Sequence, residues 1–132
     1  MEGEMTPDLM YLVWSAALTV AMVLVAVFAA MMQVGLPALA GNRDDMPPLT
    51  GFAGRAERLH LNMLQNLPLF AILVLAAAVT NRADGVTALG ASLFFWARVV
   101  HGVFYLIGVP WLRTMAWCVS IVGLVLIFVR LI

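Results

Sequence analysis

Charged side chains are scarce in this sequence, and neither sign of charge dominates. Charged residues make up only 11% of the 132 residues, and 7 acidic side chains balance 7 basic ones. A neutral chain lacks the positive surface that binds phosphate backbones, so we expect no nucleic-acid partner. By contrast, 64% of the residues are hydrophobic, and the mean hydropathy is +1.04. A soluble domain of this length cannot bury so much apolar surface, so the sequence predicts an integral membrane protein.

Lysine is absent, and cysteine occurs once. All the basic residues are arginines, and Cys118 has no second cysteine with which to form a disulfide inside the chain. We interpret Cys118 as a small buried hydrophobe of a membrane helix. The N-terminal segment MEGEMTPDL also lacks the basic region of a signal peptide. We therefore expect the first apolar segment to remain in the mature protein.

Four apolar segments are long enough to cross a bilayer as helices, which takes about 20 residues each. They cover residues about 9–35, 62–80, 87–108 and 114–131. Runs of this length exclude the strands of a membrane barrel. The last two connectors are tight turns that make their flanking helices antiparallel, whereas the first is a long loop containing Pro47 and Pro48. The sequence predicts an all-α, up-down-up-down four-helix bundle, with residues 1–132 as one membrane domain.

The distribution of arginine predicts how the bundle crosses the membrane, because positively charged loops stay in the cytoplasm. One side of the predicted bundle, that of the first and third connectors, carries Arg43, Arg55, Arg58 and Arg113. The opposite side carries fewer arginines and the acidic N-terminus. We expect the long first loop in the cytoplasm and both termini outside.

Polar side chains continue into two of the apolar segments at helical spacing. Two sets share a helix face: Arg58, Asn62 and Gln65 around the start of the second segment, and Arg98, His101 and Tyr105 toward the end of the third. Because these segments are antiparallel, the start of one lies at the depth of the end of the other. We expect the two stripes to meet in the same half of the bundle, near Arg113 at the start of the fourth segment.

A purely structural interpretation accounts for several of these side chains. Arg58 and Arg113 are close enough to a helix end to reach the headgroups, and Asn62 and Gln65 can join helices by hydrogen bonds. Arg98 differs because it lies near the middle of its segment. An arginine there costs at least about 2.5 kcal/mol and must face protein or water.

The apolar segments contain no acidic residue to pair with Arg98, and Glu57 at their boundary is the nearest candidate. An arginine-rich pocket that lacks carboxylates indicates an anion-binding site. His60 and His101 have no cysteine or carboxylate at ligand spacing, so no metal site is expected. Nucleophile-elbow, P-loop and dinucleotide motifs are absent, and no repeat relates the two halves as in many transporters.

The segments RAERLHLNMLQNLPLF and ARVVHGVFYLIGVPWLRT resemble the MAPEG family, the membrane-associated proteins in eicosanoid and glutathione metabolism. The resemblance covers essentially the whole chain in length, number of spans and the long first loop. It implies a homotrimer of four-helix subunits with glutathione bound between neighbouring subunits in the cytoplasmic half. The chain resembles bacterial-type members, which implies the bacterial inner membrane.

The resemblance also implies roles for individual residues. Arg113 matches the arginine that stabilises the glutathione thiolate, with Tyr105 beside it. The positions that match glutathione-binding residues are Arg58, His60, Asn62, Gln65, Arg98 and His101, of which His60 reaches across from the adjacent subunit. A guanidinium beside the sulfur lowers the thiol pKa, which suits nucleophilic attack by a thiolate.

The sequence supports two functions of different kinds. The first is a glutathione-dependent transferase or peroxidase that acts on lipophilic electrophiles from the bilayer. The alternative is a non-catalytic membrane accessory or lipid-binding trimer, which could belong to a larger membrane complex. Gln65 favours the alternative, because the family usually places a glutamate at this position. A small transporter is disfavoured, because the polar stripes reach through only half of the membrane.

Overall fold

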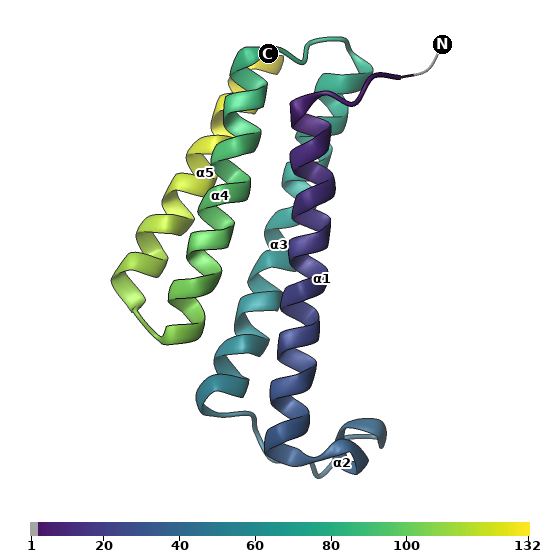
Figure 1. Ribbon diagram of the computed structural model, residues 1–132, viewed down its shortest axis with the longest axis vertical. Coiled ribbons are helices and arrows are strands. Elements are labelled where there is room, and N and C mark those ends of the chain that lie inside the picture. The colour runs from purple at the N-terminus through teal and green to yellow at the C-terminus, as the bar shows by residue number, and fades with distance from the viewer. Residues whose placement is uncertain (1–2) are drawn as a thin grey trace.

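The computed structural model describes residues 3–132 and contains the helices α1 (Pro7–Val34), α2 (Leu36–Ala40), α3 (Gly51–Val79), α4 (Gly85–Ile107) and α5 (Pro110–Leu131) (Figure 1). All except α2 are long and apolar enough to cross a membrane, and the described residues contain no strand. The long helices alternate in direction. One end of the bundle, which we call the termini end, holds the C-terminus, the start of α1 and the α3–α4 connection (Figure 1). The opposite end, the loop end, holds α2 and the α4–α5 turn. The predicted all-α, four-helix membrane fold is confirmed.

Local sequence signals set several helix ends. Thr6 caps α1 through its side-chain oxygen, which accepts a hydrogen bond from a first-turn N–H. Asp84 and Thr87 form a reciprocal capping box at the start of α4. Gly108 ends α4 with a φ of 79°, a left-handed conformation that favours glycine. Short-range chemistry therefore explains where α4 begins and ends.

α3 begins at Gly51, well before the apolar segment that starts near residue 62. The additional turns are helical because Ala53 and Ala56 are buried against alanines of α1. Packing against a neighbouring helix thus extends the helix into a segment whose composition is that of a loop. α5 likewise begins before its apolar segment, at Pro110. The long first loop is correspondingly shorter than the sequence suggested.

One cluster of buried side chains draws on all four long helices. Phe70 of α3 stacks on Phe94 of α4 with ring centroids 4.2 Å apart, and both side chains are fully buried. The remaining members of the cluster are Met22, Leu59, Met63, Val74, Ala91, Leu124 and Ile127. Many large apolar side chains instead point outward, which is the arrangement expected where lipid surrounds the protein.

α4 and α5 approach each other closely through glycine. A β-carbon on Gly90 would lie 2.6 Å from the carbonyl oxygen of Gly123, so no larger residue fits without moving a backbone. The buried face of α5 consists mainly of small residues such as Ala116 and Ser120. Cys118 lies on the exposed face of α5, so the prediction that it is buried in the chain is wrong. Hydrophobicity did not distinguish the two faces, because both are apolar in a membrane helix.

Candidate functional site

Arg98 is the centre of the polar contacts between α3 and α4. Its side chain is 0% exposed, and its Nη2 donates a hydrogen bond to Oδ1 of Asn62 at 2.6 Å. Asn66, one turn further along α3, donates from Nδ2 to the backbone carbonyl of Asn62 at 2.8 Å. The prediction that Arg98 faces protein is confirmed. A single chain already buries Arg98, so shielding this charge does not by itself require a second subunit.

Arg98 has no carboxylate partner within residues 3–132. Its Nε and Nη1 atoms are buried and make no hydrogen bond to the described chain. Glu57, the nearest candidate in the sequence, instead lines a pocket of about 360 Å³ between α1, α3 and the loop that contains α2. A buried guanidinium with uncompensated charge is costly, and an anion that accepts its free N–H groups removes that cost.

Three further side chains extend this site from α4 to α5. His101, one turn after Arg98, is 2% exposed, and its Nδ1 atom makes no hydrogen bond within the described residues. The His101 ring meets the Tyr105 ring in an edge-on arrangement, with centroids 5.5 Å apart and an interplanar angle of 64°. The Cζ atom of Arg113 lies over the Tyr105 ring, 4.5 Å from its centroid. We call Asn62, Arg98, His101, Tyr105 and Arg113 the arginine cluster.

The α4–α5 turn places Arg113 beside Tyr105. The N–H groups of Gly108 and Val109 both donate to the carbonyl of Phe104, at 3.1 and 3.0 Å, and this closes the end of α4. α5 starts immediately afterwards, so Arg113 lies in its first turns. Arg55 of α3 donates from Nε to the carbonyl of Leu106 at 3.0 Å and so satisfies a carbonyl in the last turn of α4.

The structure does not bring every predicted residue into the arginine cluster. Arg58 and Gln65 are exposed on α3, on the same side of the helix as Asn62. His60 is half-buried and lines the pocket that contains Glu57, on the side of α3 that faces α1. Within one chain, Arg58, His60 and Gln65 therefore lie outside the cluster.

Two supporting residues were missed in the sequence. Asn66 follows Asn62 by one helical turn, and this spacing predicts the contact between them. The sequence places Arg55 only on the side of the first and third connectors, whereas in the structure its side chain binds the end of α4. No sequence signal identifies that contact, because it joins residues 51 positions apart.

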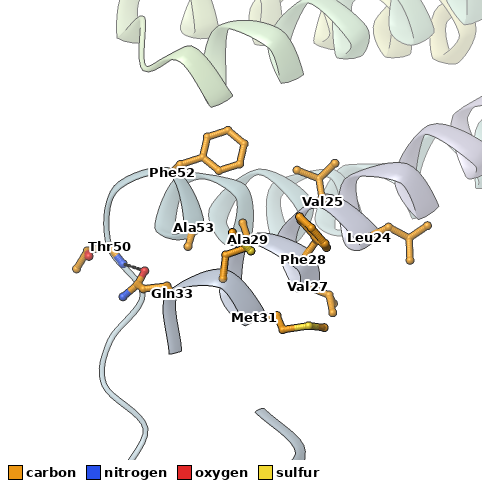
Figure 2. A pocket seen from close by; sticks show the side chains of 11 residues that line it. Leu24, Val25, Val27, Phe28, Ala29, Met31, Gln33, Thr50, Phe52 and Ala53 are labelled. Atoms are coloured by element: carbon orange, nitrogen blue, oxygen red, sulfur yellow. Dashed lines mark hydrogen bonds between the residues drawn. The ribbon is translucent and has the colours of Figure 1, made fainter. Parts of the chain in front are cut away.

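An apolar groove of about 1050 Å³ lies at the loop end, along the last turns of α1 and the start of α3 (Figure 2). Its walls include Leu24, Phe28 and Phe52, and no charged side chain lines it. Gln33 at its edge binds the first loop, accepting from the N–H of Thr50 at 3.0 Å and donating to the carbonyl of Pro48 at 3.1 Å. The groove therefore offers apolar contact and no ionisable side chain.

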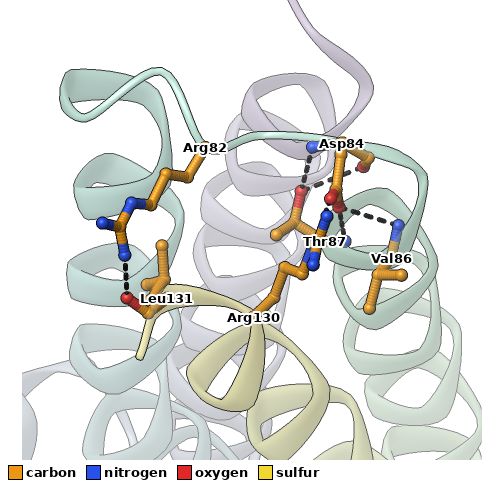
Figure 3. Close-up of polar contacts among 6 residues, drawn as sticks. All are labelled: Arg82, Asp84, Val86, Thr87, Arg130 and Leu131. Carbon is orange, nitrogen blue, oxygen red and sulfur yellow. Dashed lines mark hydrogen bonds and ion pairs between the residues drawn. The ribbon is translucent and has the colours of Figure 1, made fainter.

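A second polar cluster lies at the termini end (Figure 3). Arg130 of α5 forms an ion pair with Asp84, and Arg82 donates to the carbonyl of Leu131. The hydrogen bond from Arg130, together with that from the Thr87 N–H, lowers the pKa of Asp84 below its ordinary value. These contacts connect the end of α5 to the α3–α4 connection and leave each charged group with a partner.

A comparison with protein families identifies the chain over nearly its whole length. The model of the MAPEG family matches residues 9–132. No curated protein and no solved structure matches the chain. The matched residues include all of α2 to α5, most of α1 and every member of the arginine cluster. The chain belongs to the MAPEG family.

Proposed function

We propose that this membrane protein is a glutathione-dependent transferase or peroxidase acting on lipophilic electrophiles that reach it from the bilayer. The observation that carries the proposal is Arg98, a buried guanidinium with free N–H donors and no carboxylate beside it in the described chain. Glutathione has two carboxylates and an ionisable thiol, and MAPEG proteins are associated with glutathione metabolism. Its charges complement those of the arginine cluster.

The cluster divides into a binding part and a reacting part. Arg98, Asn62 and His101 hold the carboxylates and backbone of the tripeptide through charge-assisted hydrogen bonds. Arg113 faces the sulfur and stabilises the thiolate. In conjugation to a chloronitrobenzene, the thiolate forms a C–S bond to the ring carbon, chloride leaves with the electrons of the C–Cl bond, and the thiol proton passes to solvent.

A homotrimer accounts for the residues that lie outside the cluster. Arg58 and Gln65 are exposed on α3, where a neighbouring subunit would cover them, and His60 lies on the opposite side, where it would face the glutathione bound to a neighbour. This assembly places Arg58, His60 and Gln65 around glutathione shared between two chains. Native mass spectrometry in mild detergent should show trimers, and a spectrum containing only monomers contradicts the assembly.

A thermal-shift titration of the purified protein with glutathione tests the proposal. A ligand at 100 times its dissociation constant should add about 2.7 kcal/mol of stability. The dimethyl ester of glutathione is the matched control, because it keeps the peptide and thiol but lacks both carboxylate charges, and it should stabilise the protein much less. Equal shifts for the two compounds would contradict binding by Arg98.

The second candidate is a non-catalytic accessory or lipid-binding trimer. Gln65 favours it, because an amide gives a weaker hold on the glutathione amino group than the usual glutamate. This candidate predicts neither stabilisation by glutathione nor conjugation above the uncatalysed rate. Those two results together would contradict the transferase proposal and support the non-catalytic candidate.

The orientation in the membrane is proposed from the arginine distribution, with the long loop cytoplasmic and both termini outside. Thr50 in that loop, replaced by cysteine in a Cys118→Ser background, should resist an impermeant thiol reagent applied from outside the cell. Labelling from the outside would reverse the orientation.

A further inference from the structure

Tyr105 lies between two nitrogen-containing side chains. The His101 ring meets it edge-on, with centroids 5.5 Å apart, and the Arg113 guanidinium carbon lies 4.5 Å from its centroid. His101 is almost fully buried and Tyr105 is half-buried, so His101 limits the movement of the phenol ring. Arg113 is only half-buried and forms no hydrogen bond or ion pair through its side chain within the described chain. Its one specific side-chain contact there is the face of Tyr105.

The backbone makes this contact possible but does not fix the guanidinium. The closed α4–α5 turn brings the backbones of Tyr105 and Arg113 close to each other. The Arg113 side chain nevertheless has several rotatable bonds, so the backbone alone does not determine where its guanidinium lies. A guanidinium over an aromatic face is attracted by the electrons of the ring and keeps its edge N–H groups free. A ring held by His101 therefore orients the N–H groups of Arg113 for an anion.

We infer that Tyr105 is a positioning residue for Arg113 and that it acts through its ring rather than through its hydroxyl. If Arg113 stabilises the glutathione thiolate, Tyr105 contributes to that stabilisation through Arg113, and this consequence rests on the proposed function. The positioning of Arg113 by Tyr105 does not rest on the proposed function, because both residues belong to the same chain. The two parts are tested separately.

The first experiment needs no ligand and follows the modification of Arg113 by phenylglyoxal, measured by mass spectrometry. Tyr105→Leu removes the ring and should speed the modification about two- to fivefold, whereas Tyr105→Phe keeps the ring and should leave the rate near that of the wild type. Trp111→Leu is the matched control, because it removes an exposed aromatic side chain from the first turn of α5, two residues before Arg113. Arg43 in the first loop serves as the internal reference. Equal rates in all variants, or equal acceleration by Tyr105→Phe and Tyr105→Leu, would overturn the inference.

The second experiment titrates the thiol of bound glutathione by the ultraviolet absorbance of its thiolate. Tyr105→Leu should raise the thiol pKa as Arg113→Ala does, the double variant should raise it no further, and Tyr105→Phe should keep the wild-type value. A raised pKa in Tyr105→Phe would show that the hydroxyl acts on the sulfur directly and would contradict the inference. If the wild type binds no glutathione, the proposed function fails while the phenylglyoxal result still decides the role of the ring.

Discussion

The arginines of the arginine cluster differ from those of the termini end in how their charge is satisfied. At the termini end, Arg130 pairs with Asp84, and Arg82 binds the carbonyl of Leu131, so both cations are satisfied by the chain itself (Figure 3). Toward the loop end, Arg98 is buried with a single hydrogen bond to an amide, and Arg113 rests on an aromatic ring. The first arrangement neutralises charge and connects helices. The second leaves positive charge and free N–H donors, which is the condition for binding an anion.

Helix packing also differs between two glycines of α4. Near the termini end, Gly90 approaches the backbone of Gly123, where a β-carbon would meet a carbonyl oxygen at 2.6 Å. Nearer the loop end, a β-carbon on Gly102 would meet the Sδ-bound methyl carbon of Met22 at 3.2 Å. A backbone cannot give way, whereas the end of a methionine side chain can. A larger residue is therefore harder to accommodate at Gly90, between α4 and α5, than at Gly102, where α4 meets Met22 of α1.

The largest expected effect comes from exchanging one arginine at each end for methionine. Arg98→Met should abolish the stabilisation by glutathione, because it removes the buried guanidinium that binds a carboxylate of the ligand. The stabilisation lost is about 2.7 kcal/mol at 100 times the dissociation constant. The ligand-free protein should be no less stable, since Arg98 has no carboxylate partner in the described chain and an uncompensated buried charge is costly. Arg82→Met should retain the response to glutathione. Thermal shifts with and without ligand check both variants, and a full response in Arg98→Met would refute the contrast between the two ends.

Within the loop end, Arg113 and Arg58 should affect different kinetic parameters. Arg113→Ala should slow conjugation by about tenfold for each 1.4 kcal/mol of lost thiolate stabilisation. It should also move the pH dependence of the rate to higher pH, because the thiol pKa rises. Arg58→Ala should mainly raise KM, because contacts to a carboxylate are the same in the ground and transition states. Conjugation of a chloronitrobenzene to glutathione in detergent micelles measures both. An Arg113→Ala enzyme with unchanged kcat would remove Arg113 from the reacting part of the site.

The glycine contrast predicts a smaller effect on stability. Gly90→Ala should destabilise the protein by about 1–3 kcal/mol, because the new methyl group collides with a backbone carbonyl. Gly102→Ala should cost less, since the Met22 side chain can move aside. Gly85, which has open space around it, provides the control Gly85→Ala. Thermal unfolding of the three variants in one detergent gives the order of their stabilities. A greater loss in Gly102→Ala than in Gly90→Ala would contradict this difference between the two glycine contacts.

The smallest effect concerns the ion pair at the termini end. The folded pKa of Asp84 is lowered, so the unfolded chain binds more protons, and the contribution of this carboxylate to stability is present above about pH 4. It is lost as the pH falls through the folded pKa. Asparagine at position 84 can still cap the helix but cannot ionise. The free energy of unfolding of the Asp84→Asn protein should therefore fall less than that of the wild type between about pH 5 and pH 2. Parallel curves for the two proteins would show that the ion pair contributes nothing.

The sequence by itself determined the class of fold and the depth of the key charge. Long apolar segments without charges can satisfy their backbones in lipid only as helices, and short connectors force antiparallel neighbours. An arginine near the middle of such a segment must face protein, which the buried Arg98 confirms. Helical spacing also predicted that Asn62 and Arg98 lie at one depth, and the structure joins them by a hydrogen bond.

Only the tertiary structure decided which partner each polar side chain contacts and which side chains stay exposed. Arg55 and Arg58 are three residues apart on α3, yet Arg55 satisfies the end of α4 whereas Arg58 is exposed. The extra turns at the start of α3 and the exposed position of Cys118 also depended on the neighbouring helices. The physical reason is that both faces of a membrane helix are apolar, so hydrophobic periodicity, which orients helices in water, carries little information in lipid. Which face turns inward is then decided by close packing and by hydrogen bonds between residues far apart in the chain.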